Sequence, residues 1–285
     1  MSSLTSPGLI KAANEALVKA APELNSARLF AYDMSPDFSD YGLVVKVPIV
    51  ASGSISAFNE STNDYENSDG TISWATVTLS CQPKSTFDFS GKDILEAPNA
   101  PYWNQCAEAA ANGIRSYVSQ AIGANFLSTE ITATTTLTGD LTMTKLAKLR
   151  NQCLARIADT VLVLSPDLYA ETLGLFSANV FGSDEPVRNG YVGNLYGFKA
   201  VMQCKDMPTG IKGALVPTNA IAVASRAVTV GDIYPYSEYG TVSDEFGFTL
   251  TFLRHGSART GKGYINCTSL FGVKTVQPDM IKLII

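Results

Sequence analysis

The chain has 285 residues, a formal net charge of −5, and 46% hydrophobic but only 16% charged side chains. This length is sufficient for a large buried core, and the composition excludes a disordered or collagen-like chain. The acidic balance argues against a dedicated nucleic-acid-binding protein, because such proteins neutralise phosphates with basic patches. Since ordinary soluble proteins contain about 25% charged residues, the low charged share predicts that other subunits cover much of the surface.

Cysteine usage and the N-terminal residues indicate a reducing compartment. The five cysteines are odd in number, scattered, and form no CxxC motif. This pattern favours buried free thiols over a disulfide framework. Residues 1–9 contain neither the basic nor the apolar segment of a signal peptide, and no run of 18 apolar residues could span a membrane. We therefore expect a protein that is not secreted and has no membrane partner.

The N-terminal segments predict a helix followed by a long hairpin. Residues 8–21 place apolar side chains on one face of a helix, which Pro22 ends. Residues 43–51 and 72–81 are strand-like, and Pro48 confines the first strand to an edge or a bulge. The segment between them is too rich in Asn, Asp, Ser and Gly to be buried. A hairpin of this kind is marginal alone and needs a surface to lie on.

The clearest helix is predicted over residues 99–123. Pro101 suits the first helical turn, and Gly123 suits the position just after the last turn. Apolar or small side chains recur at intervals of three or four along one face, at Tyr102, Cys106, Ala110, Ile114, Tyr117 and Ala121. At 1.5 Å per residue this helix is roughly 35 Å long. It can serve as the spine of a domain.

Helices and strands alternate in the next part of the chain. Residues 144–159 predict a helix with apolar residues on one face. Its opposite face is basic, with Lys145, Lys148, Arg150 and Arg156. A nucleic-acid or lipid contact is one interpretation of this face, and a solvated surface is the interpretation we favour. Residues 160–164 predict a buried strand, and Ser165 and Pro166 then begin a helix. This alternation is typical of an α/β arrangement.

The C-terminal part of the sequence is largely β. Residues 191–197 and 198–204 predict short strands, and a short helix is predicted after Pro217. Residues 246–285 predict further strands and end in an apolar tail. Neither a linker nor an internal repeat divides the chain.

The sequence contains little that could support catalysis. His255 is the only histidine, so any Ser-His-Asp, Cys-His or histidine metal site must include it. It lies beside Arg254 at a predicted strand end, and we expect a structural role. Residues 256–262 match GxxxxGK, but Gly263 replaces the Ser or Thr of a P-loop and a strand follows. We interpret this segment as a turn between two strands.

Carboxylates gather in two polar segments, residues 64–69 and 232–245. Acid–base catalysis needs a concave apolar setting that shifts one pKa, and polar loops rarely provide it. A solvated loop is the favoured interpretation, and a weak cation site or a subunit contact is the alternative. We therefore expect no catalytic residue, no cofactor and no metal site.

Three local patterns accompany this order of segments. They are G-x-L-Y-G-F at residues 193–198, a Met-Pro turn at Met207 and Pro208, and an Ala-rich segment at 219–227. Together with the hairpin and the spine helix, they make the chain resemble the major capsid proteins of tailed bacteriophages with the HK97-like fold. The resemblance covers nearly the whole chain in order, although each motif alone is degenerate.

This resemblance implies a mixed α+β fold of five parts. They are an N-terminal arm (1–42), an extended β-hairpin called the E-loop (43–92), a peripheral domain with the spine helix (93–131), an α/β axial domain (132–240) and a return to the peripheral domain (241–285). It also implies intersubunit contacts at the hairpin and the spine helix, which we expect at Ile55, Phe58, Trp74, Val77, Tyr102 and Tyr117.

The function implied by the resemblance is self-assembly and not catalysis. Pentamers and hexamers would form the icosahedral head of a phage, assembled in the host cytoplasm and enclosing double-stranded DNA with which the shell has only non-specific proximity. Only about forty residues precede the first strand, so we expect a separate scaffolding protein, besides a portal and a possible decoration protein. Lys46, Lys84 and Lys92 flank the loop but none lies at its tip, so we expect no cross-link.

Two alternatives remain at this point. An encapsulin-like compartment shell shares the fold and encloses an enzyme as cargo, which would require a groove for a cargo peptide. A standalone α/β enzyme ranks third, because it needs a site that the sequence does not contain.

Overall fold

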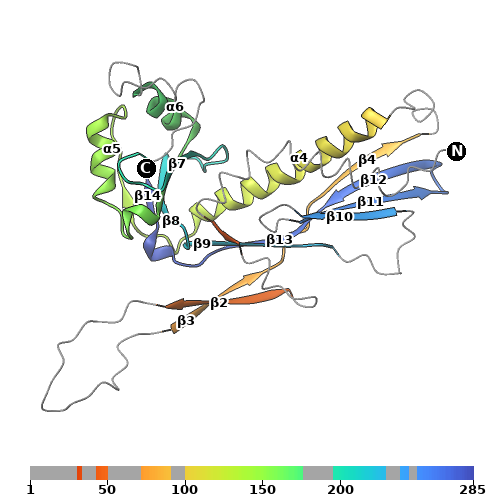
Figure 1. Cartoon of the computed structure of the whole chain (residues 1–285), viewed down its shortest axis with the longest axis horizontal. Coiled ribbons are helices and arrows are strands. Elements are labelled where there is room, and N and C mark those ends of the chain that lie inside the picture. Colours follow the sequence, from red (N-terminus) through yellow and green to blue (C-terminus); the bar gives the residue numbers. More distant parts are fainter. Residues whose placement is uncertain are drawn as a thin grey trace, which may run out of the picture.

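The computed structural model describes residues 31–33, 43–50, 72–90, 100–175, 195–228, 238–243 and 249–285. The predicted helix at 8–21 lies outside these residues, as do both carboxylate segments apart from 238–243. Figure 1 shows an elongated molecule, with a long helix along a sheet at one end, a compact lobe at the other, and a hairpin projecting from the body between them.

Three α-helices and four sheets make up the described part. The helices are α4 (Ala100–Ala124), α5 (Met143–Arg150) and α6 (Pro166–Leu175). Short 3₁₀ turns cover Asn125–Leu127, Ile157–Asp159 and Pro278–Met280. The helix predicted over 99–123 and the mixed α+β fold class are therefore confirmed.

An antiparallel four-stranded sheet lies along α4. Its order is β10 (Glu238–Ser243), β11 (Thr249–Ser257), β12 (Lys262–Thr268) and β4 (Lys84–Phe89). Helix α4 packs on β4 and β12 through its buried side chains, Cys106, Ala110, Ala111, Ile114, Val118 and Ile122. The sequence analysis placed residues 84–89 with the hairpin, whereas β4 pairs with β12.

The central sheet connects the two ends of the molecule. It has the order β1 (Ala31–Asp33), β9 (Ile221–Arg226) and β13 (Leu270–Thr275), with β1 parallel and β13 antiparallel to β9. The short helix predicted after Pro217 is wrong, because a turn there leads directly into β9. The β9 side chains Ile221, Ala222 and Ala224 are all buried, which a strand between two partners achieves and an exposed helix does not.

The compact lobe contains a five-stranded mixed sheet. Its order is β5 (Thr134–Thr135), β14 (Lys282–Ile284), β8 (Gly213–Pro217), β6 (Thr160–Leu164) and β7 (Ala200–Gln203). Alternate β6 side chains enter different cores, since Val161 and Val163 join the cluster with the α4 residues, while Leu162 and Leu164 join the cluster with α5 and α6. Both short helices therefore cover one face of this sheet.

Two local predictions in the lobe are wrong. The helix predicted over 144–159 ends at Arg150, where the N–H of Asn151 bonds back to Lys148 and tightens the last turn. Residues 195–198 form a turn instead of a strand, because Tyr196 and Gly197 have φ angles of 52° and 84°. Such left-handed residues interrupt a strand.

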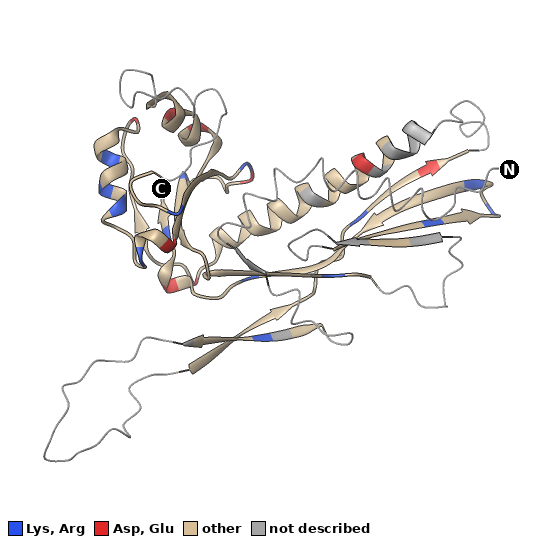
Figure 2. Cartoon of the chain, in the orientation of Figure 1, with Lys and Arg blue, Asp and Glu red and all other residues tan. Residues whose placement is uncertain are grey.

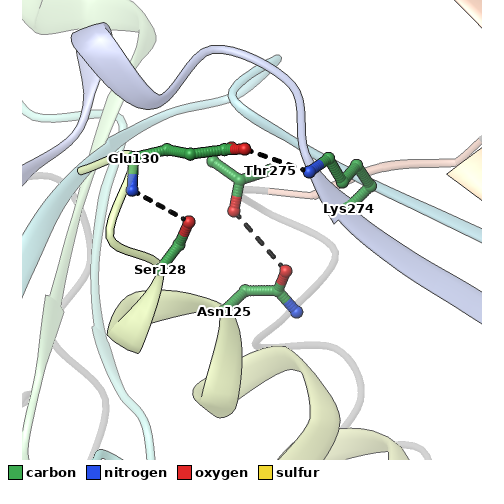
Figure 3. A network of polar contacts seen from close by, with 5 residues as sticks. All are labelled: Asn125, Ser128, Glu130, Lys274 and Thr275. Carbon is green, nitrogen blue, oxygen red and sulfur yellow. Dashed lines mark hydrogen bonds and ion pairs between the residues drawn. The ribbon is translucent and has the colours of Figure 1, made fainter. Parts of the chain in front are cut away.

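A polar network fastens the end of α4 to the central sheet (Figure 3). The Asn125 amide donates to the carbonyl of Ala121 at 2.7 Å, and its oxygen accepts from Thr275 at 3.5 Å. The amine of Lys274 lies 3.5 Å from the carboxylate of Glu130. Because Thr275 and Lys274 belong to β13, these contacts fix the spine helix relative to the strand that runs toward the lobe.

Two glycines permit close backbone contacts. Gly123 lies inside α4 and not after it as predicted, and an added Cβ would lie 2.3 Å from the carbonyl oxygen of Asp206. At Gly272 in β13, an added Cβ would lie 2.2 Å from the carbonyl oxygen of Thr78 in β3. At both positions only glycine fits, because neighbouring backbone atoms leave no room for a Cβ atom. The φ angles of these two glycines are not the reason.

Gly272→Ala should therefore separate the hairpin from the central sheet. We expect a loss of unfolding free energy of about 1–3 kcal/mol or more from the steric clash, measured by thermal or denaturant unfolding. Gly174→Ala is the matched control, because nothing lies within 4 Å of the added methyl group in α6. This control should stabilise the protein by about 0.5–1 kcal/mol. Equal stability of both variants would contradict the packing described here.

Candidate intersubunit surfaces

The two-stranded hairpin has two faces that differ in chemistry. Strand β2 (Val44–Val50) pairs antiparallel with β3 (Ile72–Thr78), with Pro48 opposite Trp74 and Val47 opposite Ala75. Because successive side chains alternate between faces, this register assigns each residue to one face. The expected hairpin strands, and the position of Pro48 on a strand with a single described partner, are confirmed.

The inner face belongs to the core of the subunit itself. Val77 is completely buried and Leu79 is 3% exposed, and both pack with Ala222 and Ala224 of β9 and with Val276. The side chains of Val47, Ile49 and Ala75 are partly buried against the same cluster. The side chain of Val77, which the sequence analysis expected at an intersubunit contact, is therefore already removed from water within one chain.

The outer face is exposed and carries several large apolar side chains. Trp74 is 61% exposed, Ile72 is 65% exposed and Val44 is 53% exposed. The described exposed residues of this face are Val44, Lys46, Pro48, Ile72, Trp74, Thr76 and Thr78. Exposed tryptophan beside aliphatic residues is typical of a surface that another protein covers. Val44, Pro48 and Ile72 were missed from the sequence, although the period of two around Trp74 could have identified them.

The described exposed positions of helix α4 carry no charge. Its described exposed residues are Gln105, Ala109, Asn112, Gly113, Ser116, Tyr117, Gln120 and Ala124. Most of these side chains are small, so a flat apolar surface can approach the helix closely. Tyr117 is 48% exposed, and its ring meets Phe271 edge-on at 6.2 Å. Val118, and not Tyr117, occupies the buried position on the helix.

The other expected contact residues cannot be placed on either surface. Ile55 and Phe58 lie outside the described residues. Tyr102 belongs to α4, but its side chain is also outside what the structure describes. Trp74 and Tyr117 are the two members of the predicted set whose described side chains are exposed.

The lone histidine has structural partners. His255 in β11 stacks on Tyr264 of β12 with ring centroids 5.0 Å apart, and its Nδ1 lies 3.2 Å from the amide nitrogen of Asn266. The GxxxxGK segment is the turn between β11 and β12, as predicted, and Lys262 forms an ion pair with Asp88 of β4. The lysine that a P-loop would direct at phosphate therefore connects two strands.

His255→Gln should consequently have little effect. We expect assembly to be unchanged and the unfolding free energy to fall by no more than about 1 kcal/mol, because glutamine can keep a hydrogen bond to Asn266 but loses the ring stacking. Thermal melting and sedimentation measure the two quantities. A folded, assembling variant that had lost some other function of the wild type would indicate a catalytic histidine.

The cysteines have the character expected of packing residues. All five are free thiols, as the sequence analysis predicted. Burial raises the pKa of Cys204 and of Cys153, so both remain protonated at neutral pH and are poor nucleophiles. Among the described residues, no group of three or more His, Cys, Asp or Glu could hold a metal ion. The helices in this part of the chain are also too short or too polar to cross a membrane.

Comparison with solved structures identifies the fold. The capsid of a native GTA particle aligns with a TM-score of 0.60 and 15% identity, covering 91% of this chain and 89% of the other. The capsid of cyanophage P-SCSP1u gives 0.58 and 14%, covering 90% and 86%. A virus-like particle from Pyrococcus furiosus gives 0.57 and 13%, covering 97% of each chain.

Neither the protein-family models nor the curated protein sequences give a match. The likeness in structure covers about nine tenths of the chain. The chain therefore has the HK97-like fold of phage capsid subunits.

Proposed function

We propose that this protein is the major capsid protein of a tailed bacteriophage, which self-assembles into an icosahedral head around double-stranded DNA. The observation that supports this most directly is the exposed apolar outer face of the hairpin, on a subunit with a capsid fold. In a monomer, Trp74 and Ile72 stay largely exposed to water and contribute little to the stability of the fold. A shell in which each hairpin lies on a neighbour gives these side chains a partner.

In this proposal the receiving surface is the outward face of α4 in the adjacent copy. The described exposed positions of that face carry no charge and most of their side chains are small, so a flat apolar surface can approach them closely. The contact joins two different surfaces of one chain, and contacts of that kind generate closed rings when the rotation between neighbouring copies closes. The proposal keeps the five parts expected from the sequence, with β4 moved from the hairpin to the peripheral sheet and β14 to the sheet of the lobe.

The proposal is for a structural subunit without a catalytic role. The structural partners of His255 and the protonated state of Cys204 and Cys153 support it. A separate scaffolding protein, a portal and a possible decoration protein would be its partners during assembly in the host cytoplasm, and the mature protein would reside in the virion. The net charge of −5 suits a shell that does not bind packaged DNA tightly.

A compartment shell is the second candidate, because the Pyrococcus furiosus particle aligns over 97% of both chains. Its TM-score of 0.57 lies between those of the phage capsids, 0.51 to 0.60, so the likeness does not favour it. Nuclease-protected DNA in particles recovered from the phage host supports the phage head. Particles that enclose an enzyme and no DNA support the compartment.

Sedimentation velocity of the purified protein over a concentration series tests assembly itself. We expect capsomers and shells above a threshold concentration, with the threshold lowered by a scaffolding protein. A single monomeric species at every concentration, with or without scaffold, would contradict the proposal.

A further inference from the structure

The two helices of the compact lobe carry opposite charges. Helix α5 contains Lys145, Lys148 and Arg150 and no acidic residue, whereas α6 contains Asp167 and Glu171 and no basic residue. In Figure 2 the ribbon of α5, on one side of the lobe, carries basic positions in blue, and the ribbon of α6, at an adjoining side, carries acidic positions in red. In a chain with only 16% charged residues, this separation is a distinctive feature of the lobe.

The packing of the helices directs these charges outward. Leu146 and Leu149 of α5 and Leu168 and Tyr169 of α6 enter the same buried cluster on one face of the five-stranded sheet. The side chains of Lys148, Arg150, Asp167 and Glu171 are consequently exposed. Asp167 and Glu171 are four residues apart, so they lie on one flank of α6.

Contacts within the chain do not neutralise the basic residues of α5 or the acidic residues of α6. Among the described residues, Lys148, Arg150 and Asp167 form no ion pair. The amine of Lys145 donates to the carbonyl oxygen of Thr138 at 2.7 Å, which fixes its position but leaves its charge. One oxygen of Glu171 accepts from the N–H of Leu141 at 2.9 Å, which fixes the carboxylate beside the start of α5.

We propose that the basic α5 of one copy contacts the acidic α6 of the next copy around each ring. The inference rests on the proposed function and specifies which surfaces of the lobe meet. Opposite charges on two separate flanks suit a head-to-tail contact, in which different surfaces of identical chains meet and the arrangement closes into a ring. A two-fold contact between identical flanks would instead bring like charges together.

A nucleic acid is the other ligand that a basic helix could bind. The carboxylates of Asp167 and Glu171 on the adjoining flank repel phosphate, and the chain as a whole is acidic. The same carboxylates complement a second copy, so the charge pattern favours the subunit contact. Each exposed ion pair contributes little to the binding free energy by itself. Reversing the charges of one helix, however, places like charges opposite each other at every contact of a ring.

Charge-reversed variants test the proposal. The α5 variant is Lys148→Glu with Arg150→Glu, and the α6 variant is Asp167→Lys with Glu171→Gln, which keeps an oxygen to accept from Leu141. Each variant alone should need at least a tenfold higher protein concentration to form rings, with an unchanged melting temperature. Lys84→Glu with Arg259→Glu is the control for the α5 variant, because both residues are exposed outside the lobe and the net charge changes as much as in that variant.

Mixing the two variants in equal amounts gives the sharpest test. In an alternating ring every contact again joins an acidic helix to a basic one, so mixing should restore six-membered rings. Five-membered rings cannot alternate and should remain rare in native mass spectra. If the α5 variant destabilises the subunit, Lys148→Gln with Arg150→Gln should weaken assembly without adding repulsion.

The outcomes separate this inference from the proposed function. If the wild type forms no rings or shells, the proposed function fails. If the wild type assembles and both charge-reversed variants assemble as readily as the control, this inference alone is wrong. If the α5 variant assembles normally but loses binding to a DNA duplex that the wild type binds, the basic helix is a nucleic-acid contact instead.

Discussion

Replacing Ile72 and Trp74 together with serine is expected to leave a folded, soluble subunit that no longer forms shells. Both side chains are more than half exposed within the subunit, so its own core loses little. On a neighbouring surface, burial of each would contribute about 1.5–3 kcal/mol. Their combined loss corresponds to a change of about two to four orders of magnitude in the affinity of each contact.

Thermal melting and sedimentation velocity together check this expectation. The melting temperature of the unassembled subunit should be close to that of the wild type, while the shell fraction falls to zero at concentrations where the wild type assembles fully. Leu154→Ser is the matched control, because this leucine is 46% exposed on the lobe and away from the hairpin. Shells formed normally by the double variant would show that the outer face of the hairpin is not an assembly surface.

Leu79→Ala is expected to give the opposite result. Leu79 is 3% exposed and packs with Val77, Ala222 and Val276, so truncation leaves a cavity inside the subunit. We expect the unfolding free energy to fall by about 2–5 kcal/mol. Denaturant unfolding of the unassembled subunit measures this loss, with a midpoint shift at constant slope as the sign of a pure stability change.

The two variants distinguish the roles of the two faces of one hairpin. If Leu79→Ala unfolds like the wild type but fails to assemble, the inner face contacts a neighbour and the assignment of faces is reversed. If it is destabilised but assembles when stabilised by lower temperature, the inner face serves the subunit core alone. The latter is the result that the packing of Val77 and Leu79 predicts.

Local patterns in the sequence were sufficient to predict α4, the hairpin strands and the strand β6. Helix α4 and the hairpin strands show the periods of 3.6 and 2, and β6 is a continuous apolar run; these signals can be recognised without knowing which element packs against them. The prediction of a helix over 144–159 was wrong because the apolar spacing continues through Cys153 and Ile157, whereas the helix itself ends at Arg150. A pattern of side chains does not by itself fix where backbone hydrogen bonds end.

The pairing of distant strands could not be derived in this way. Strand β4 pairs with β12, with Lys84 opposite Thr268, and nothing local in either segment specifies the other. The lack of pairing information also affected the prediction of intersubunit contact residues. Trp74 and Val77 were both expected at the same contact, because the register that places them on opposite faces of the hairpin was not known.

Cryo-electron microscopy of the purified, assembled protein tests the central claim most directly. The account predicts closed icosahedral shells built of rings, in which the outer face of each hairpin, with Trp74, lies on α4 of an adjacent copy. Particles whose hairpins remain uncovered, or a protein that stays monomeric under all assembly conditions, would contradict it.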